Sequence, residues 1–134
     1  MAFGVYIHIP FCSRRCDYCA FATWTDRHHL IEGYIDACRT ELARAELPDA
    51  TSVFVGGGTP SLVPAASLAA LLADVALEEG AEVTVECNPE TVTPFLVDTL
   101  LDAAGTSDGV PPPTKTLVAR GRSARASSLW HASM

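Results

Sequence analysis

Three short apolar runs alternate with three amphipathic segments in the first hundred residues, and this alternation limits the fold more than any other feature. The runs are Val5–Ile9, Ser52–Val55 and Glu82–Glu86, and each contains β-branched residues typical of strands. A β-α-β-α-β-α order favours right-handed crossovers and a parallel sheet. The first two runs are apolar along most of their length, which predicts helices on both faces of that sheet.

The segments between and after the runs have helical spacing. Helices are expected over 27–46, 64–77 and 93–104, with Asp26 as N-cap of the first and Thr93 as N-cap of the third. The apolar face of the first helix consists of Leu30, Ile31, Tyr34, Ile35, Cys38 and Leu42. This placement makes core packing the expected role of Cys38.

Each predicted strand is followed directly by an unusual motif. A cysteine-rich segment follows the first strand, GGGTPS follows the second, and Glu86-Cys87-Asn88-Pro89 closes the third. The carboxyl ends of parallel strands lie at one edge of a sheet, where α/β folds gather their reactive groups. The three motifs are therefore expected to converge.

The first motif places Cys12, Cys16 and Cys19 within eight residues. Three thiolates with C-x3-C-x2-C spacing can hold three irons of a cubane cluster and leave the fourth open. The alternatives are a zinc site completed by His8 or Cys87, or simply buried cysteines. Structural zinc sites usually use paired C-x2-C units, and the sequence has no second pair.

The other two motifs suit a small ligand. Three glycines before Thr59 and Pro60 allow close approach to the backbone, although an ordinary tight turn would also use them. They do not match the phosphate-binding G-x4-G-K-[ST] pattern. Glu86 can accept two hydroxyl hydrogen bonds, as a ribose offers, or be a solvated strand-end acid. Tyr6 suits a ligand site or the core. The pattern gives no chemistry to His28 and His29.

Composition excludes several functional classes. The net charge of -7 argues against nonspecific binding to nucleic acid or to anionic membranes. No apolar run approaches the ~20 residues of a membrane span, and the start lacks the features of a signal peptide. A cytoplasmic location is expected, where clustered thiols stay reduced and serve metal or redox chemistry.

With these motifs, residues 3 to about 105 resemble the radical S-adenosylmethionine (SAM) superfamily, in the branch of the HemW-type heme chaperones and the oxygen-independent coproporphyrinogen III oxidases. The resemblance implies half of a partial (β/α)6 barrel, a [4Fe-4S] cluster on the three cysteines, and SAM on the open iron. Reduction would cleave SAM to methionine and a 5′-deoxyadenosyl radical. The implied SAM-binding residues are Tyr6, Tyr18, Gly57, Gly58, Thr59 and Glu86.

Within this branch the resemblance favours the chaperone over the oxidase. The oxidases carry a further cysteine at the position of Phe21, and an extension before the first strand. The implied partners are heme or porphyrin, an acceptor protein for heme, and an electron donor such as a flavodoxin or ferredoxin. The alternatives are the oxidase, which converts coproporphyrinogen III to protoporphyrinogen IX, and an inactive or zinc-binding α/β fragment.

The composition changes at Gly105. Residues 1–105 hold 15 acidic and 5 basic side chains, whereas residues 106–134 hold 1 and 4. The second segment contains Pro111-Pro112-Pro113 and a polar run, which predicts an irregular, disordered tail without a fourth strand. We expect 1–105 to be the N-terminal part of the barrel and 106–134 an aberrant tail, from a frameshift or truncation. Half a barrel is expected to be marginally stable or to aggregate, unless a partner supplies the rest.

Overall fold

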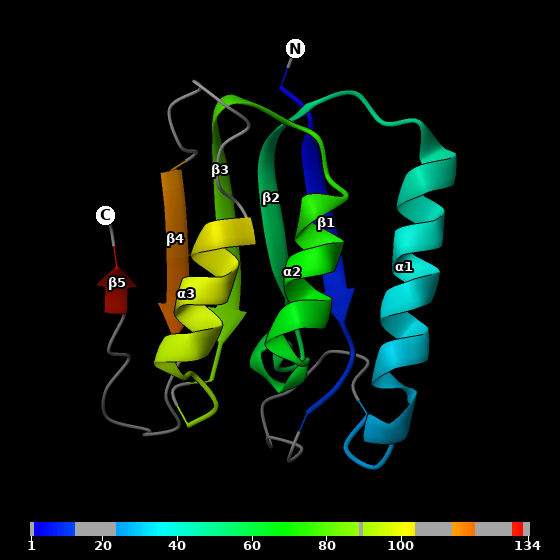
Figure 1. Cartoon of the computed structure of the whole chain (residues 1–134), viewed down its shortest axis with the longest axis vertical. Coiled ribbons are helices and arrows are strands. Elements are labelled where there is room, and N and C mark those ends of the chain that lie inside the picture. The colour runs from blue at the N-terminus through cyan, green and yellow to red at the C-terminus, as the bar shows by residue number, and fades with distance from the viewer. Residues whose placement is uncertain (1, 13–23, 89, 104–113, 120–129, 133–134) are drawn as a thin grey trace.

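The computed structural model describes residues 2–12, 24–88, 90–103, and the backbone of 114–119 and 130–132. It is an α/β fold in which strands and helices alternate (Figure 1). The strands are β1 (Gly4–Ile9), β2 (Ala50–Gly57), β3 (Leu77–Cys87), β4 (Thr114–Ala119) and β5 (Trp130–Ala132). The helices are η1 (His28–Leu30), α1 (Ile31–Ala45), η2 (Pro60–Leu62), α2 (Ala65–Ala73) and α3 (Pro94–Ala103).

The strands form a sheet in the order β1-β2-β3-β4-β5, with parallel pairing from β1 through β4. The predicted parallel sheet is therefore confirmed. Strand order follows chain order, so right-handed crossovers place successive helices on the same side of the sheet. In Figure 1, α2 and α3 lie in front of the sheet, α1 flanks β1, and α2 packs beside both other helices.

Burial alternates along the strands because only one face lies against the helices. In β1, Ile7 and Ile9 are buried while Tyr6 is 56% exposed; in β2, Val53 and Val55 are buried while Phe54 is 39% exposed. The expectation of helices on both faces is thus wrong for the described residues. The core includes these inward strand residues together with Ile31, Ile35, Leu68, Leu71, Leu96 and Leu100 of the helices.

Two element boundaries differ from the sequence prediction for local reasons. The second helix ends at Ala73 rather than 77, because the chain turns at Asp74 and Leu77 already pairs with Ala50 of β2. β3 is consequently longer than predicted. Its register shifts between the Ala50 and Ser52 pairings, and Gly80 in this stretch has a φ of +76°, a backbone conformation that suits glycine.

The helix starts give one confirmed cap and one correction. Thr93 Oγ1 accepts a hydrogen bond from Leu96 N–H at 3.1 Å, as expected of an N-cap. Asp26 is not the cap of the first helical segment: η1 precedes α1, and Arg27 and Leu30 occupy the two cap positions without side-chain caps.

The segment after α3 also differs from expectation. The sequence predicted no fourth strand, yet Thr114–Ala119 pairs in parallel with β3, from Glu82–Thr114 to Cys87–Ala119. β5 then pairs antiparallel with β4. The short apolar run at 117–119 becomes a strand because the edge of β3 supplies backbone hydrogen-bond partners that the run could not find locally. The predicted boundary near Gly105 falls outside the described residues.

Candidate functional site

The carboxyl ends of β1 and β2 lie side by side, because the last residues of the two strands are paired. His8 pairs with Gly56 and Ile9 with Gly57. Beyond the strands, Gly58 N–H donates to Ile9 O at 2.6 Å, and Thr59 N–H donates to Phe11 O at 2.7 Å. This pairing carries the chain that follows β1 alongside the GGGTPS segment.

The pairing brings the first cysteine and the glycine motif together. Thr59 Oγ1 lies 3.9 Å from Cys12 Sγ and is oriented to donate to it. Both side chains are at least nine-tenths buried. Cys16, Cys19 and Tyr18 lie outside the described residues. Of the implied cluster ligands, the structure therefore places Cys12 at this edge.

The glycines of the motif are required by atoms of this chain. A Cβ on Gly58 would collide with the Phe11 carbonyl and lie 2.8 Å from Ile9 O. A Cβ on Gly57, whose φ is +105°, would lie 2.6 Å from the His8 ring. Close packing of β1 against β2 thus explains these two glycines. This agrees with the alternative that the glycines serve a tight turn. Because glycine has no side chain, the backbone of both residues is also left uncovered.

Glu86 lies at the same edge, on the face without helices. Its Oε2 would lie 3.0 Å from a Cβ on Gly56, so the carboxylate sits directly beside the glycine motif. Phe54 also lies against Gly56, and Tyr6 stacks on Phe54 with ring centroids 5.9 Å apart. Tyr6 OH hydrogen-bonds His8 Nδ1 at 3.0 Å. Tyr6 is therefore not a core residue, because its side chain is on the open face.

The remaining thiols fit structural roles. Burial raises the pKa of the Cys87 thiol from 9.0 to about 12, with a smaller contribution from the Glu86 charge, so Cys87 stays protonated at neutral pH. Cys87 belongs to the cluster of buried core residues, which suits a structural role. Cys38 packs against the core as predicted, and burial raises its pKa too. Within the described ranges, no cluster of three or more His, Cys, Asp or Glu could hold a metal.

Sequence reasoning missed contacts around Cys12 that span long stretches of chain. His28 Nε2 lies 2.9 Å from Cys12 O, and Cys12 N–H donates to Trp24 O at 2.9 Å. Tyr34 OH donates to His8 O, and burial raises the tyrosine pKa.

A further contact joins the glycine motif to the third strand. Ser61 Oγ accepts from Asn88 N–H at 3.1 Å, which ties the GGGTPS segment to the chain after β3. No spacing signal could have identified these residues, because each acts through tertiary contact.

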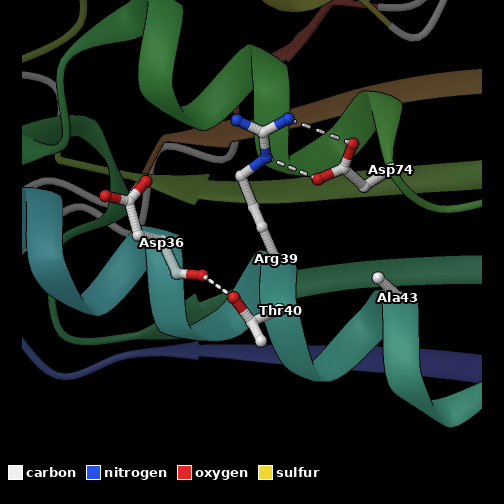
Figure 2. A pocket seen from close by; sticks show the side chains of 5 residues that line it. All are labelled: Asp36, Arg39, Thr40, Ala43 and Asp74. Atoms are coloured by element: carbon white, nitrogen blue, oxygen red, sulfur yellow. Dashed lines mark hydrogen bonds and ion pairs between the residues drawn. The ribbon is translucent and has the colours of Figure 1, made fainter.

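A second feature lies away from this edge, on the outer surface of the helices. Figure 2 shows a hollow lined by Asp36, Arg39, Thr40, Ala43 and Asp74. Arg39 Nε donates to Asp74 Oδ2 at 2.5 Å and its Nη2 to Oδ1 at 3.3 Å, an ion pair that joins α1 to the end of α2. The pairing with Asp74 raises the Arg39 pKa. The hollow has the features of a contact between helices rather than of a reactive site.

Known proteins resemble this arrangement in sequence and in fold. The sequence model described as "Radical SAM superfamily" matches residues 6–112. The chain belongs to the radical SAM superfamily. It is 41% identical over 115 residues to the "Heme chaperone HemW" of Mycobacterium tuberculosis, covering 78% of this chain and 30% of that protein. A mouse mitochondrial protein, "Radical S-adenosyl methionine domain-containing protein 1", is 40% identical over 95 residues, covering 64% of this chain and 21% of that one.

A solved structure supports the fold. The chain superimposes on the coproporphyrinogen III oxidase of Escherichia coli with a TM-score of 0.69 and 24% identity, covering 89% of this chain and 28% of that one. At that identity the likeness shows the fold alone, and the fold is that of a partial radical SAM barrel. The chain spans less than a third of the length of each of these three proteins. Among the described helices, none has the length and apolar character that crossing a bilayer requires.

Proposed function

We propose that this chain carries the N-terminal part of a HemW-type radical SAM site, acting in heme or porphyrin metabolism. Cys12, Cys16 and Cys19 would hold a [4Fe-4S] cluster, and SAM would occupy the adjacent edge of the sheet. The observation that carries the proposal is the meeting of Cys12 Sγ with Thr59 Oγ1, which joins the cluster segment to the GGGTP motif.

The described residues suit this cofactor pair. Gly57, Gly58 and Thr59 would receive the methionine end of SAM, because the two glycines have no side chain to cover the backbone there and Thr59 follows them directly. Glu86, beside Gly56, would accept the ribose hydroxyls, with Tyr6 on the same open face and Tyr18 beside the adenine. When bound, the reduced cluster supplies the electron for SAM cleavage. The Thr59 hydroxyl would donate to the Cys12 thiolate, a contact that tunes a cluster's potential.

The chaperone assignment rests on the named relatives. Proteins called heme chaperone HemW from M. tuberculosis and Lactococcus lactis are 41% and 38% identical to this chain. We propose heme as the cargo, a separate protein as its acceptor, a flavodoxin or ferredoxin as electron donor, and the cytoplasm as the location. The alternative is oxidative decarboxylation of coproporphyrinogen III, which the E. coli structural neighbour's title names.

The test is anaerobic reconstitution with iron and sulfide, followed by EPR after reduction, with and without SAM. We expect a [4Fe-4S]⁺ signal that SAM perturbs, and loss of that signal in Cys12→Ala. Cys38→Ala is the matched control, because that thiol packs on α1 against the core. Absence of a cluster, or a cluster insensitive to SAM, would refute the proposed site in this chain.

A second experiment distinguishes the chaperone from the oxidase by what the protein delivers or produces. Transfer of bound heme to an apo-acceptor would support the chaperone, and formation of protoporphyrinogen IX would support the oxidase. Zinc bound in place of iron, with no response to SAM, would indicate the fragment alternative.

A further inference from the structure

The two sides of the cysteine segment are joined at its base. Cys12 N–H donates to Trp24 O at 2.9 Å, and Trp24 N–H donates to Pro10 O at 2.5 Å. Phe11 and Trp24 form a parallel bridge, with ring centroids 6.0 Å apart in an edge-to-face contact. Trp24 therefore lies directly beside the segment from Pro10 to Cys12.

His28 adds a side-chain contact to this base. Its Nε2 lies 2.9 Å from the Cys12 carbonyl oxygen, across 16 residues of sequence. A carbonyl only accepts, so Nε2 must carry the hydrogen and donate it. The bond therefore fixes the orientation of the Cys12 carbonyl group.

Cys12 is consequently held at three points. Trp24 accepts from its amide, His28 donates to its carbonyl, and Thr59 donates to its sulfur. We propose that His28 is a positioning residue that orders Cys12 before the cluster binds. This inference rests on the proposed function for its purpose, but the ordering itself is a property of the apo chain. Ordering a ligand in advance removes an entropic cost from binding and slows release.

The surrounding fold does not depend on His28. Phe11 is fully buried, its carbonyl accepts from Thr59 N–H, and the neighbouring Ile9 carbonyl accepts from Gly58 N–H. Tyr34 packs on the Phe11 ring at 5.5 Å. His28 itself lies in η1 on the exposed side. Replacing His28 should therefore loosen Cys12 while leaving the end of β1 in place.

Four variants separate positioning from general stability. His28→Ala removes the donor, and His28→Gln restores one at nearly the same reach, because the Gln Nε2 is as many bonds from the backbone as the His Nε2. His28→Asn places its donor one bond short. His29→Ala is the matched control, because His29 is the next residue, is also exposed, and makes no such bond to Cys12.

The first readout is hydrogen exchange at the Cys12 and Trp24 amides in the apo chain. We expect exchange roughly threefold to tenfold faster in His28→Ala and in His28→Asn, the range that one hydrogen bond gives. His28→Gln and His29→Ala should match the unmodified chain. Equal protection in His28→Ala and the unmodified chain would overturn the proposal.

The second readout is the rate at which a chelator removes iron from the reconstituted protein. The same order is expected, with His28→Ala losing iron severalfold faster and His28→Gln restored. Faster amide exchange without faster iron loss would overturn the positioning role. An unmodified chain that takes up no cluster would refute the proposed function, and the apo exchange comparison would then decide alone whether His28 orders Cys12.

Discussion

Successive residues of each strand point to opposite faces of the sheet, and the two faces have different roles. On the helix side, Ile9 and Val55 are fully buried and Val85 is almost so. On the open side, at neighbouring positions, lie Tyr6, Phe54 and Glu86, which are exposed or half-buried. One face holds the fold together, and the other carries groups that a ligand can contact.

The difference shows why the strands look more apolar than a half-covered sheet requires. With Tyr6 and Phe54, the first two strands are apolar along most of their length, a pattern that predicts burial on both faces. The two side chains instead form an aromatic pair on the open face. Large aromatic side chains there offer area for stacking a ligand or for closing against further chain. Five predictions test this division, in order of decreasing effect.

The largest effect should come from truncating the helix-side face. Ile9→Ala removes a side chain with no exposed area and should lower the free energy of unfolding by about 3 kcal/mol. Tyr6→Ala, on the opposite face of the same strand, should cost less than about 1 kcal/mol, since Tyr6 is more than half exposed. Urea denaturation of both variants measures this, and equal losses would show that the two faces share one core.

The junction between β1 and β2 should tolerate no side chain. Gly58→Ala places a methyl group against the Phe11 and Ile9 carbonyls and should destabilise the fold by about 2 kcal/mol. Gly33→Ala is the matched control: it lies in α1 with open space around it and should stabilise by about 0.5 kcal/mol. The same urea titrations apply, and a neutral Gly58→Ala would contradict the packing described for this edge.

Alkaline pH should weaken the helix side through Cys87. Its folded-state pKa is raised from 9.0 to about 12, chiefly by burial, so the folded state favours the protonated thiol. That contribution is fully present below about pH 9 and is lost as pH rises toward 12. Unfolding measured from pH 7 to 11 should show this slope. Cys87→Ala should flatten it, and an unchanged slope would assign the loss to other groups.

Function on the open face should depend on position along β3. Glu86→Gln should weaken the SAM response of the reconstituted cluster roughly fivefold, because a charged acceptor at the carboxyl edge is lost. Glu82→Gln removes the same charge on the same face, four residues earlier at the middle of the strand, and should leave the response unchanged. EPR titration with SAM compares them. Equal weakening would mean that overall charge, rather than placement, governs binding.

The smallest effect should come from the outer helix surface. Arg39→Ala breaks the exposed ion pair with Asp74 seen in Figure 2 and should lower the melting temperature less than any destabilising variant above. High salt should abolish the difference between the variant and the unmodified chain, because salt screens exposed charges. A large, salt-independent loss would make this surface part of the core after all.

Much of the architecture was predictable from the sequence. The order of strands and helices, the parallel pairing and the Thr93 cap all follow from local patterns that the structure keeps. The convergence of Cys12, Thr59 and Glu86 on one edge was also predictable, because parallel strands place their carboxyl ends together. The marginal stability expected of this chain and the roles of all the implied cluster-binding and SAM-binding residues stay predictions.

Tertiary structure decided what local pattern could not encode. Strand order placed the helices on one face, which decided that Tyr6 and Phe54 lie on the open face and not in the core. The edge of β3 gave 114–119 a strand partner that its own composition did not suggest. The contact of His28 with Cys12 joins residues 16 positions apart, because η1 lies beside the chain that follows β1. Sequence periodicity indicates which residues are buried and which segments form strands or helices. Which residues they contact depends on distant segments of the chain coming together in the folded protein.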